Sequence, residues 1–128
     1  MTSRSWLMLH MRAEEIKLLL ARCRFRHTSE EDLQEALGRL FSTSGVPFER
    51  EVRLNPRDRI DFLLEGGIGL EVKIKGSGAS TASQMRRYSA SERVTALILV
   101  TDRVQASGLP PTLGGKPVFV VTPLSGLL

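Results

Sequence analysis

Helical and strand-like spacings of apolar residues divide the chain into successive elements. Residues 12–22, "RAEEIKLLLAR", carry Ile16, Leu19 and Leu20 at the i, i+3, i+4 spacing of an amphipathic helix. The basic run "RCRFRH" follows directly. It is either a solvated helix end, where cations offset the negative end of the helix dipole, or a contact for phosphate.

A second helix is predicted to begin at Thr28 or Ser29. Thr28 as N-cap and Glu31 at the third helical position fit a capping box. The apolar stripe of this helix consists of Leu33, Leu37, Leu40 and Phe41. On a helical wheel Glu30 falls close to this stripe, whereas Glu31 and Glu35 point away. Glu30 is therefore either an inward-facing acid or a first-turn acid that the helix dipole favours.

Strand-like patterns fill most of the remaining chain. Three of them are expected at residues 48–54, 59–64 and 68–74, separated by the turn "NPRD" and by Glu65-Gly66-Gly67. A helix from Ser80 or Thr81 to about Ser91, an apolar strand at 94–100 and a last strand at 117–122 follow. This order predicts an α/β fold with a mixed central β-sheet flanked by helices on both faces.

Composition narrows the class of protein. The 128 residues suit one domain, and no apolar run is long enough for a membrane helix. Cys23 is the only cysteine, which excludes an internal disulfide and a cysteine-cluster zinc site and favours a reducing cytoplasm. The net charge of +4 is compatible with a polyanionic partner.

Charged residues interrupt the two most apolar central strands. Asp61 lies between Ile60 and Phe62 and is expected to point away from both, while Glu71 and Lys73 share one face of the next strand. Such residues are rarely buried unless they are paired or bind a metal.

The turn between these strands decides whether the two acids meet. A two-residue Gly66-Gly67 turn would put Asp61 and Glu71 on opposite faces of the sheet. A three-residue loop, Glu65-Gly66-Gly67, or a bulge would pair Asp61 with Glu71. We predict one of the latter two, since glycine suits the left-handed residue that such loops contain.

Two adjacent carboxylates repel each other unless one is protonated or a cation lies between them. Their hard oxygen ligands suit Mg²⁺ or Mn²⁺, with water completing the coordination shell. Lys73 would lie beside the same pocket, where it could hold a phosphate oxygen or an attacking water. Acid, acid, lysine and metal together favour phosphodiester hydrolysis.

The pattern of Asp61 followed by Glu71-Val72-Lys73 after a short hairpin resembles the PD-(D/E)XK nuclease superfamily, with its restriction-endonuclease-like αβββαβ core. The resemblance covers residues 29–122, with 1–28 as an N-terminal helical extension of a single nuclease domain, 1–128. It implies Asp61 and Glu71 as catalytic and metal-binding acids, the Val72 carbonyl as a further metal ligand, and Lys73 as a catalytic residue that assists the attacking water or offsets developing negative charge. The proline that usually precedes the first acid is Ile60 here.

Accessory residues follow from the same resemblance. Many members carry a glutamate on the preceding helix, a role that Glu30 fits. Gln84 and Tyr88, one turn apart, resemble the glutamine–tyrosine pair of the RecB-like branch. The resemblance implies that both face the active site and orient the nucleic acid or Lys73, with Gln84 as a catalytic residue and Tyr88 as a nucleic-acid-binding one. Further residues expected at the nucleic acid are Arg59, Lys75, Ser77, Ser80, Arg86 and Arg87, although the arginines are equally compatible with an ordinary solvated surface.

Together these observations predict a small Mg²⁺- or Mn²⁺-dependent deoxyribonuclease that acts in DNA recombination or repair. The short chain leaves no room for a separate recognition domain, so structure-directed or nonspecific endonuclease action is expected, with a possible homodimer or higher homo-oligomer, as in small Holliday-junction resolvases of this fold. The alternatives are a noncatalytic nucleic-acid-binding module and a subunit of a larger complex.

Overall fold

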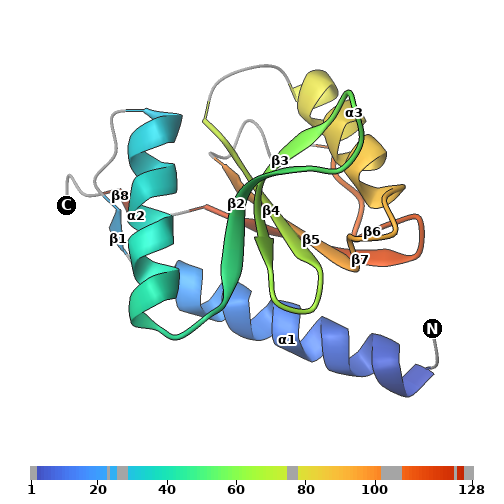
Figure 1. Cartoon of the computed structure of the whole chain (residues 1–128), viewed down its shortest axis with the longest axis horizontal. Helices are drawn as coiled ribbons and strands as arrows, with labels where there is room; N and C mark the ends of the chain where they lie inside the picture. Colours follow the sequence, from blue (N-terminus) through green and yellow to red (C-terminus); the bar gives the residue numbers. More distant parts are fainter. Residues whose placement is uncertain are drawn as a thin grey trace.

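A six-stranded mixed sheet forms the centre of the computed structural model, which describes residues 3–22, 24–25, 29–74, 78–101, 108–122 and 124–125 (Figure 1). The helices are α1 (Ser3–Ala21), α2 (Glu30–Thr43) and α3 (Gly78–Ser89). The sheet strands are β2 (Phe48–Arg53), β3 (Arg59–Leu64), β4 (Ile68–Lys73), β5 (Ala96–Thr101), β6 (Thr112–Leu113) and β7 (Lys116–Val121). Lys75, Ser77 and the predicted cap Thr28 lie outside the described residues.

The strand order is β2-β3-β4-β5-β7-β6. The first three strands are antiparallel neighbours, β5 runs parallel to both β4 and β7, and β6 returns antiparallel to β7. A separate parallel pair joins β1 (Arg24–Phe25) to β8 (Leu124–Ser125). The predicted α/β class with a mixed sheet is confirmed, whereas the short strands β1, β6 and β8 were not predicted.

Helices cover the sheet on both faces. Apolar residues of α1 and α2 form one core with Ile68, Leu70 and Val72 of β4. Met85 and Tyr88 of α3 form a second core on the opposite face. All six residues of β5 are buried, which confirms the prediction of a strand covered on both faces.

The N-terminal ends of the helices differ from the predicted ones. Ser29, not Thr28, is the N-cap of α2, and its hydroxyl accepts a hydrogen bond of 3.1 Å from the Asp32 amide. The first helix begins nine residues before the predicted start at Arg12. The inward position of Glu30 and the outward positions of Glu31 and Glu35 do agree with the helical wheel.

The hairpin between β3 and β4 has the three-residue loop that the sequence predicts. Leu64 pairs with Ile68, and the Gly67 amide donates to the Leu64 carbonyl at 3.0 Å. Gly66 and Gly67 both adopt positive φ angles, 86° and 82°, which L side chains rarely adopt. This loop sets the register that brings residues 61 and 71 to the same level of the sheet.

The alternation of faces along β3 breaks at Asp61, which corrects the expectation that Ile60 and Phe62 point the same way. Phe62 belongs to the core under α1 and α2, whereas Ile60 belongs to the core under α3. The same change occurs on β2, where Phe48 packs on the first core and Val52 lies in the second. Both strands therefore exchange faces at one level of the sheet.

Within the described part of the chain, no helix combines the length and apolar character needed to cross a bilayer.

Candidate active site

The carboxyl groups of Asp61 and Glu71 are inserted between strands β3 and β4. The Asp61 amide donates to Oε1 of Glu71 at 3.1 Å, and the Val72 amide donates to Oδ2 of Asp61 at 2.8 Å. The backbone ladder between the strands ends one residue earlier, at Phe62 and Leu70. Each acid thus takes a main-chain partner on the opposite strand, and the two acids meet at the point where the strands separate.

Burial and mutual repulsion oppose ionisation of this pair. Only 4% of Glu71 is exposed, and burial, followed by the nearby Asp61, raises its pKa to about 8. Burial also raises the pKa of Asp61, while the hydrogen bond from the Val72 amide acts in the opposite direction. Near neutral pH the pair therefore tends to share a proton or to attract a cation.

Glu30 and Lys73 complete the charged cluster. The Glu30 Oε1 accepts a 2.8 Å hydrogen bond from the Ile74 amide, which ties the start of α2 to the end of β4. The Glu30 charge raises the pKa of Asp61, and the Lys73 charge lowers it. Four of the residues predicted from the sequence, which come from two strands and one helix, are thus close enough for their charges to interact.

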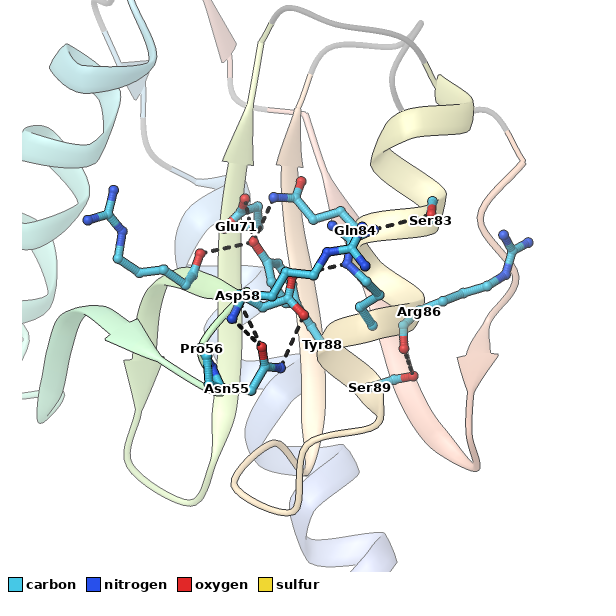
Figure 2. A network of polar contacts seen from close by, with 12 residues as sticks. Asn55, Pro56, Asp58, Glu71, Ser83, Gln84, Arg86, Tyr88 and Ser89 are labelled. Atoms are coloured by element: carbon cyan, nitrogen blue, oxygen red, sulfur yellow. Dashed lines mark hydrogen bonds and ion pairs between the residues drawn. The ribbon is translucent and has the colours of Figure 1, made fainter.

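Tyr88 and Gln84 of α3 support Glu71 from the second core (Figure 2). The Tyr88 hydroxyl lies 3.1 Å from Oε2 of Glu71 and 3.0 Å from the Arg59 carbonyl, and it accepts a hydrogen bond of 2.7 Å from the Gln84 amide. Tyr88 is 1% exposed, so its ring is not available to a nucleic acid in this structure. The predicted pairing of Gln84 with Tyr88 is observed. The burial of Tyr88, in contrast, disagrees with the prediction that this residue contacts nucleic acid directly.

A second buried acid, which the sequence analysis missed, anchors the same helix. Asp58, 6% exposed, accepts hydrogen bonds from Nε of Arg87 at 3.0 Å and from Nδ2 of Asn55 at 3.1 Å. Burial alone would raise the pKa of Asp58, but the hydrogen bonds from Arg87 and Asn55 bring it below its ordinary value. The available signal was the Asn55–Asp58 spacing, since Asn55 also accepts from the Arg57 and Asp58 amides.

The remaining predicted residues lie on β3 and α3 and differ in exposure and in their partners. Arg86 is exposed and points away from Glu71 and Tyr88 (Figure 2). Arg59 is exposed and lies 4.0 Å from Glu51, and Ser80 is exposed in the first turn of α3. Arg87 is held by Asp58 and is not a freely available cation.

The donor atoms fit a small, hard divalent cation. Among the described residues, no group of three or more histidine, cysteine, aspartate or glutamate side chains could hold a metal. A cation at this position would therefore be held by two carboxylates, with main-chain oxygen and water as the other ligands, which is a common arrangement for Mg²⁺. In a strand the amide and carbonyl of one residue point to the same side, so the Val72 carbonyl faces Asp61 as the Val72 amide does.

Comparisons of the chain with protein-family models, with curated proteins and with solved structures found no match. The fold and site define an α/β protein with a mixed sheet, in which a buried glutamate on β4 meets a partly buried aspartate on β3.

Proposed function

We propose that this protein is a divalent-metal-dependent deoxyribonuclease of the PD-(D/E)XK kind. The observation that carries the proposal is the interlocked pair Asp61 and Glu71, whose pKa values are both raised. Two acids that resist ionising together gain most from a cation that neutralises them.

Each residue of the cluster has a role in the proposed reaction. Asp61, Glu71 and the Val72 carbonyl would hold Mg²⁺ or Mn²⁺, which would supply Lewis-acid polarisation of the scissile phosphate and a more acidic water. The partly exposed Lys73 would orient the attacking water or offset charge on the phosphate. Tyr88 and Gln84 hold Glu71 in place, and Glu30 fixes the end of β4.

Exposed arginines on β3 and α3 support DNA as the substrate. Arg59 and Arg86 are accessible, and contacts of such residues with phosphates position a nucleic acid without reading its sequence. We therefore propose structure-directed or nonspecific cutting in recombination or repair, in the cytoplasm.

Cleavage of supercoiled, linear and branched DNA with Mg²⁺ or Mn²⁺ tests the proposal. We expect cutting by the wild type, loss of about 100-fold or more in Asp61→Asn and Lys73→Ala, and full activity in Glu65→Gln. Glu65 is a matched acid, exposed in the loop of the same hairpin.

Equal cutting by wild type and the Asp61 variant would contradict the proposal, because the activity would then belong to another site or another protein. Binding of DNA by the wild type without any cutting would replace it with the noncatalytic binding module.

A further inference from the structure

Glu51 has an unusual backbone conformation. It is the one non-glycine residue with a positive φ among the described residues, at 52°. Residues other than glycine, asparagine and aspartate rarely adopt this region, and when they do, the position is often functional. Glu51 lies inside β2, an edge strand of the sheet, where a regular extended conformation would be expected.

The position of Glu51 is directly opposite Asp61. The pairs on either side, Arg50 with Phe62 and Val52 with Ile60, are formed, but the pair between Glu51 and Asp61 is absent from the ladder. Both strands exchange faces of the sheet at this level. The left-handed Glu51 therefore lies at the position where the pairing of β2 with β3 is interrupted, opposite Asp61.

The released Asp61 turns toward β4. Its amide, freed from β2, donates to the Glu71 carboxylate, and its own carboxylate accepts the Val72 amide. A continuous β2–β3 ladder would instead hold the Asp61 backbone in the regular alternation, with its side chain directed off one face of the sheet. The insertion of the Asp61 carboxyl group between β3 and β4 thus coincides with the interruption opposite Asp61.

The side chain of Glu51 does not hold Asp61. It is 59% exposed, and its carboxylate lies 4.0 Å from the Arg59 guanidinium, a separation at the limit of an ion pair. The influence of residue 51 on the position of the Asp61 carboxyl group is therefore exerted by its main chain.

We propose that Glu51 is a positioning residue of the active site: its left-handed main chain keeps the β2–β3 ladder open, so that the Asp61 carboxyl group reaches β4 beside Glu71. This inference rests on the proposed function only for its catalytic consequence, since the geometry involves only residues of the chain.

Substitutions at position 51 distinguish the effect of the main-chain conformation from the effect of the side chain. Glu51→Gly accepts the left-handed region freely, whereas the β-branched Glu51→Thr and Glu51→Val oppose it more than glutamate does. Glu51→Gln removes only the charge. Glu49→Val is the matched control, because Glu49 is exposed on the same strand and also forms an ion pair, with Arg93 at 3.5 Å.

The first measurement is the scalar coupling through the hydrogen bond from the Val72 amide nitrogen to the Asp61 carboxyl carbon, by NMR on the metal-free protein. We expect it in the wild type, Glu51→Gly, Glu51→Gln and Glu49→Val. It should be weaker in Glu51→Thr and absent in Glu51→Val. The more polar threonine variant keeps the test decisive where the valine variant does not fold.

The second measurement is cleavage of DNA with Mg²⁺. A misplaced carboxyl group should lower kcat by about tenfold to 100-fold in Glu51→Val with little change in KM, while Glu51→Gly stays within about twofold of the wild type. An intact coupling in both Glu51→Thr and Glu51→Val would overturn the inference, as would a loss in Glu51→Gln equal to that in Glu51→Val. A wild type that does not cut DNA would refute the proposed function, and the coupling would still decide the role of Glu51.

Discussion

Glu71 couples the chemistry of the site to the stability of the protein. Its pKa rises from an ordinary 4.5 to about 8 on folding, because burial and Asp61 disfavour the charged form. Below pH 4.5 the group is protonated in both states and has no effect. Between these values the folded protein retains a proton that the unfolded chain has lost, so the free energy of unfolding falls as pH rises toward 8.

We expect Glu71→Gln to remove this dependence. The metal-free variant should be more stable than the wild type at pH 8, by up to a few kcal/mol, with the difference shrinking toward pH 4.5. Urea denaturation across this pH range measures the effect. A difference that does not change with pH would mean that Glu71 ionises normally in the folded protein.

Tyr88 favours the charged form of Glu71 through its hydroxyl group. In Tyr88→Phe the ring still fills the second core, but Oε2 of Glu71 and the Arg59 carbonyl lose a donor, and Gln84 loses its acceptor. We expect a loss of about 1–3 kcal/mol in stability and a further rise in the pKa of Glu71. NMR titration of the Glu71 carboxyl carbon checks the second expectation, and an unchanged pKa would show that the hydroxyl does not influence the acid.

The convergence of Asp61, Glu71, Lys73 and Glu30 was predictable from the sequence, because the three-residue glycine loop sets the register of β3 against β4 and the helical wheel places Glu30 inward. The change of faces at Asp61 was not predictable in the same way. It depends on a left-handed Glu51, and glutamate gives no sequence signal for that conformation.

At the scale of elements, the Asp58–Arg87 ion pair ties α3 to the turn before β3. The lowered pKa of Asp58 means that its contribution is present above the ordinary value of 3.8 and is lost as pH falls through the folded value. Asp58→Asn should therefore lose about 1–2 kcal/mol at neutral pH, and the difference should disappear in acid.

A double-mutant cycle with Arg87→Met measures the coupling of this pair, and Arg86→Met is its control on the same helix. Additive losses for Asp58 and Arg87 would contradict a direct interaction. Because α3 also carries Tyr88 and Gln84, kcat for DNA cleavage should fall together with stability in the Asp58 variant.

Two turn glycines offer a test of the hairpin. Gly45 and Gly67 both have positive φ angles, 71° and 82°, but a Cβ atom at Gly67 would lie 2.7 Å from the Arg93 carbonyl, while one at Gly45 meets nothing within 4 Å. We expect Gly45→Ala to cost about 1 kcal/mol and Gly67→Ala about 2–4 kcal/mol in stability. Equal losses in thermal unfolding would show that only the backbone conformation matters.

The long elements were predictable because their apolar periods extend over at least five residues, and β3 was placed at its observed bounds. The two-residue strands β1, β6 and β8 have no period to detect, and pairing partners far along the chain define them. The N-cap was misplaced by one residue, since Thr28 and Ser29 are chemically equivalent candidates.

At the scale of the whole molecule, a cation should bind in competition with the proton shared by the two acids. Mg²⁺ or Mn²⁺ should raise the melting temperature by several degrees. The increase should be larger at pH 8 than at pH 6, because at pH 8 the cation displaces a proton from a smaller fraction of the molecules. The shift should be absent in Asp61→Asn and retained in Glu65→Gln. A shift that is the same in both variants would place the cation elsewhere.

The sheet order follows from general rules of chain connection once the elements are known. Parallel β4 and β5 require a crossover, which α3 supplies, and the antiparallel β2–β3–β4 unit needs only short turns. These rules could not predict that α1 packs on the first core, because an amphipathic helix that precedes the sheet can cover either of its faces.

Tyr88 is the only tyrosine in the chain, and its hydroxyl touches the acid at the centre of the site. The vibrational bands of a phenol respond to whether its oxygen donates or accepts a hydrogen bond. Ultraviolet resonance Raman spectra of the unlabelled protein should consequently report, through the Tyr88 ring alone, whether Glu71 is protonated, ionised or bound to a cation.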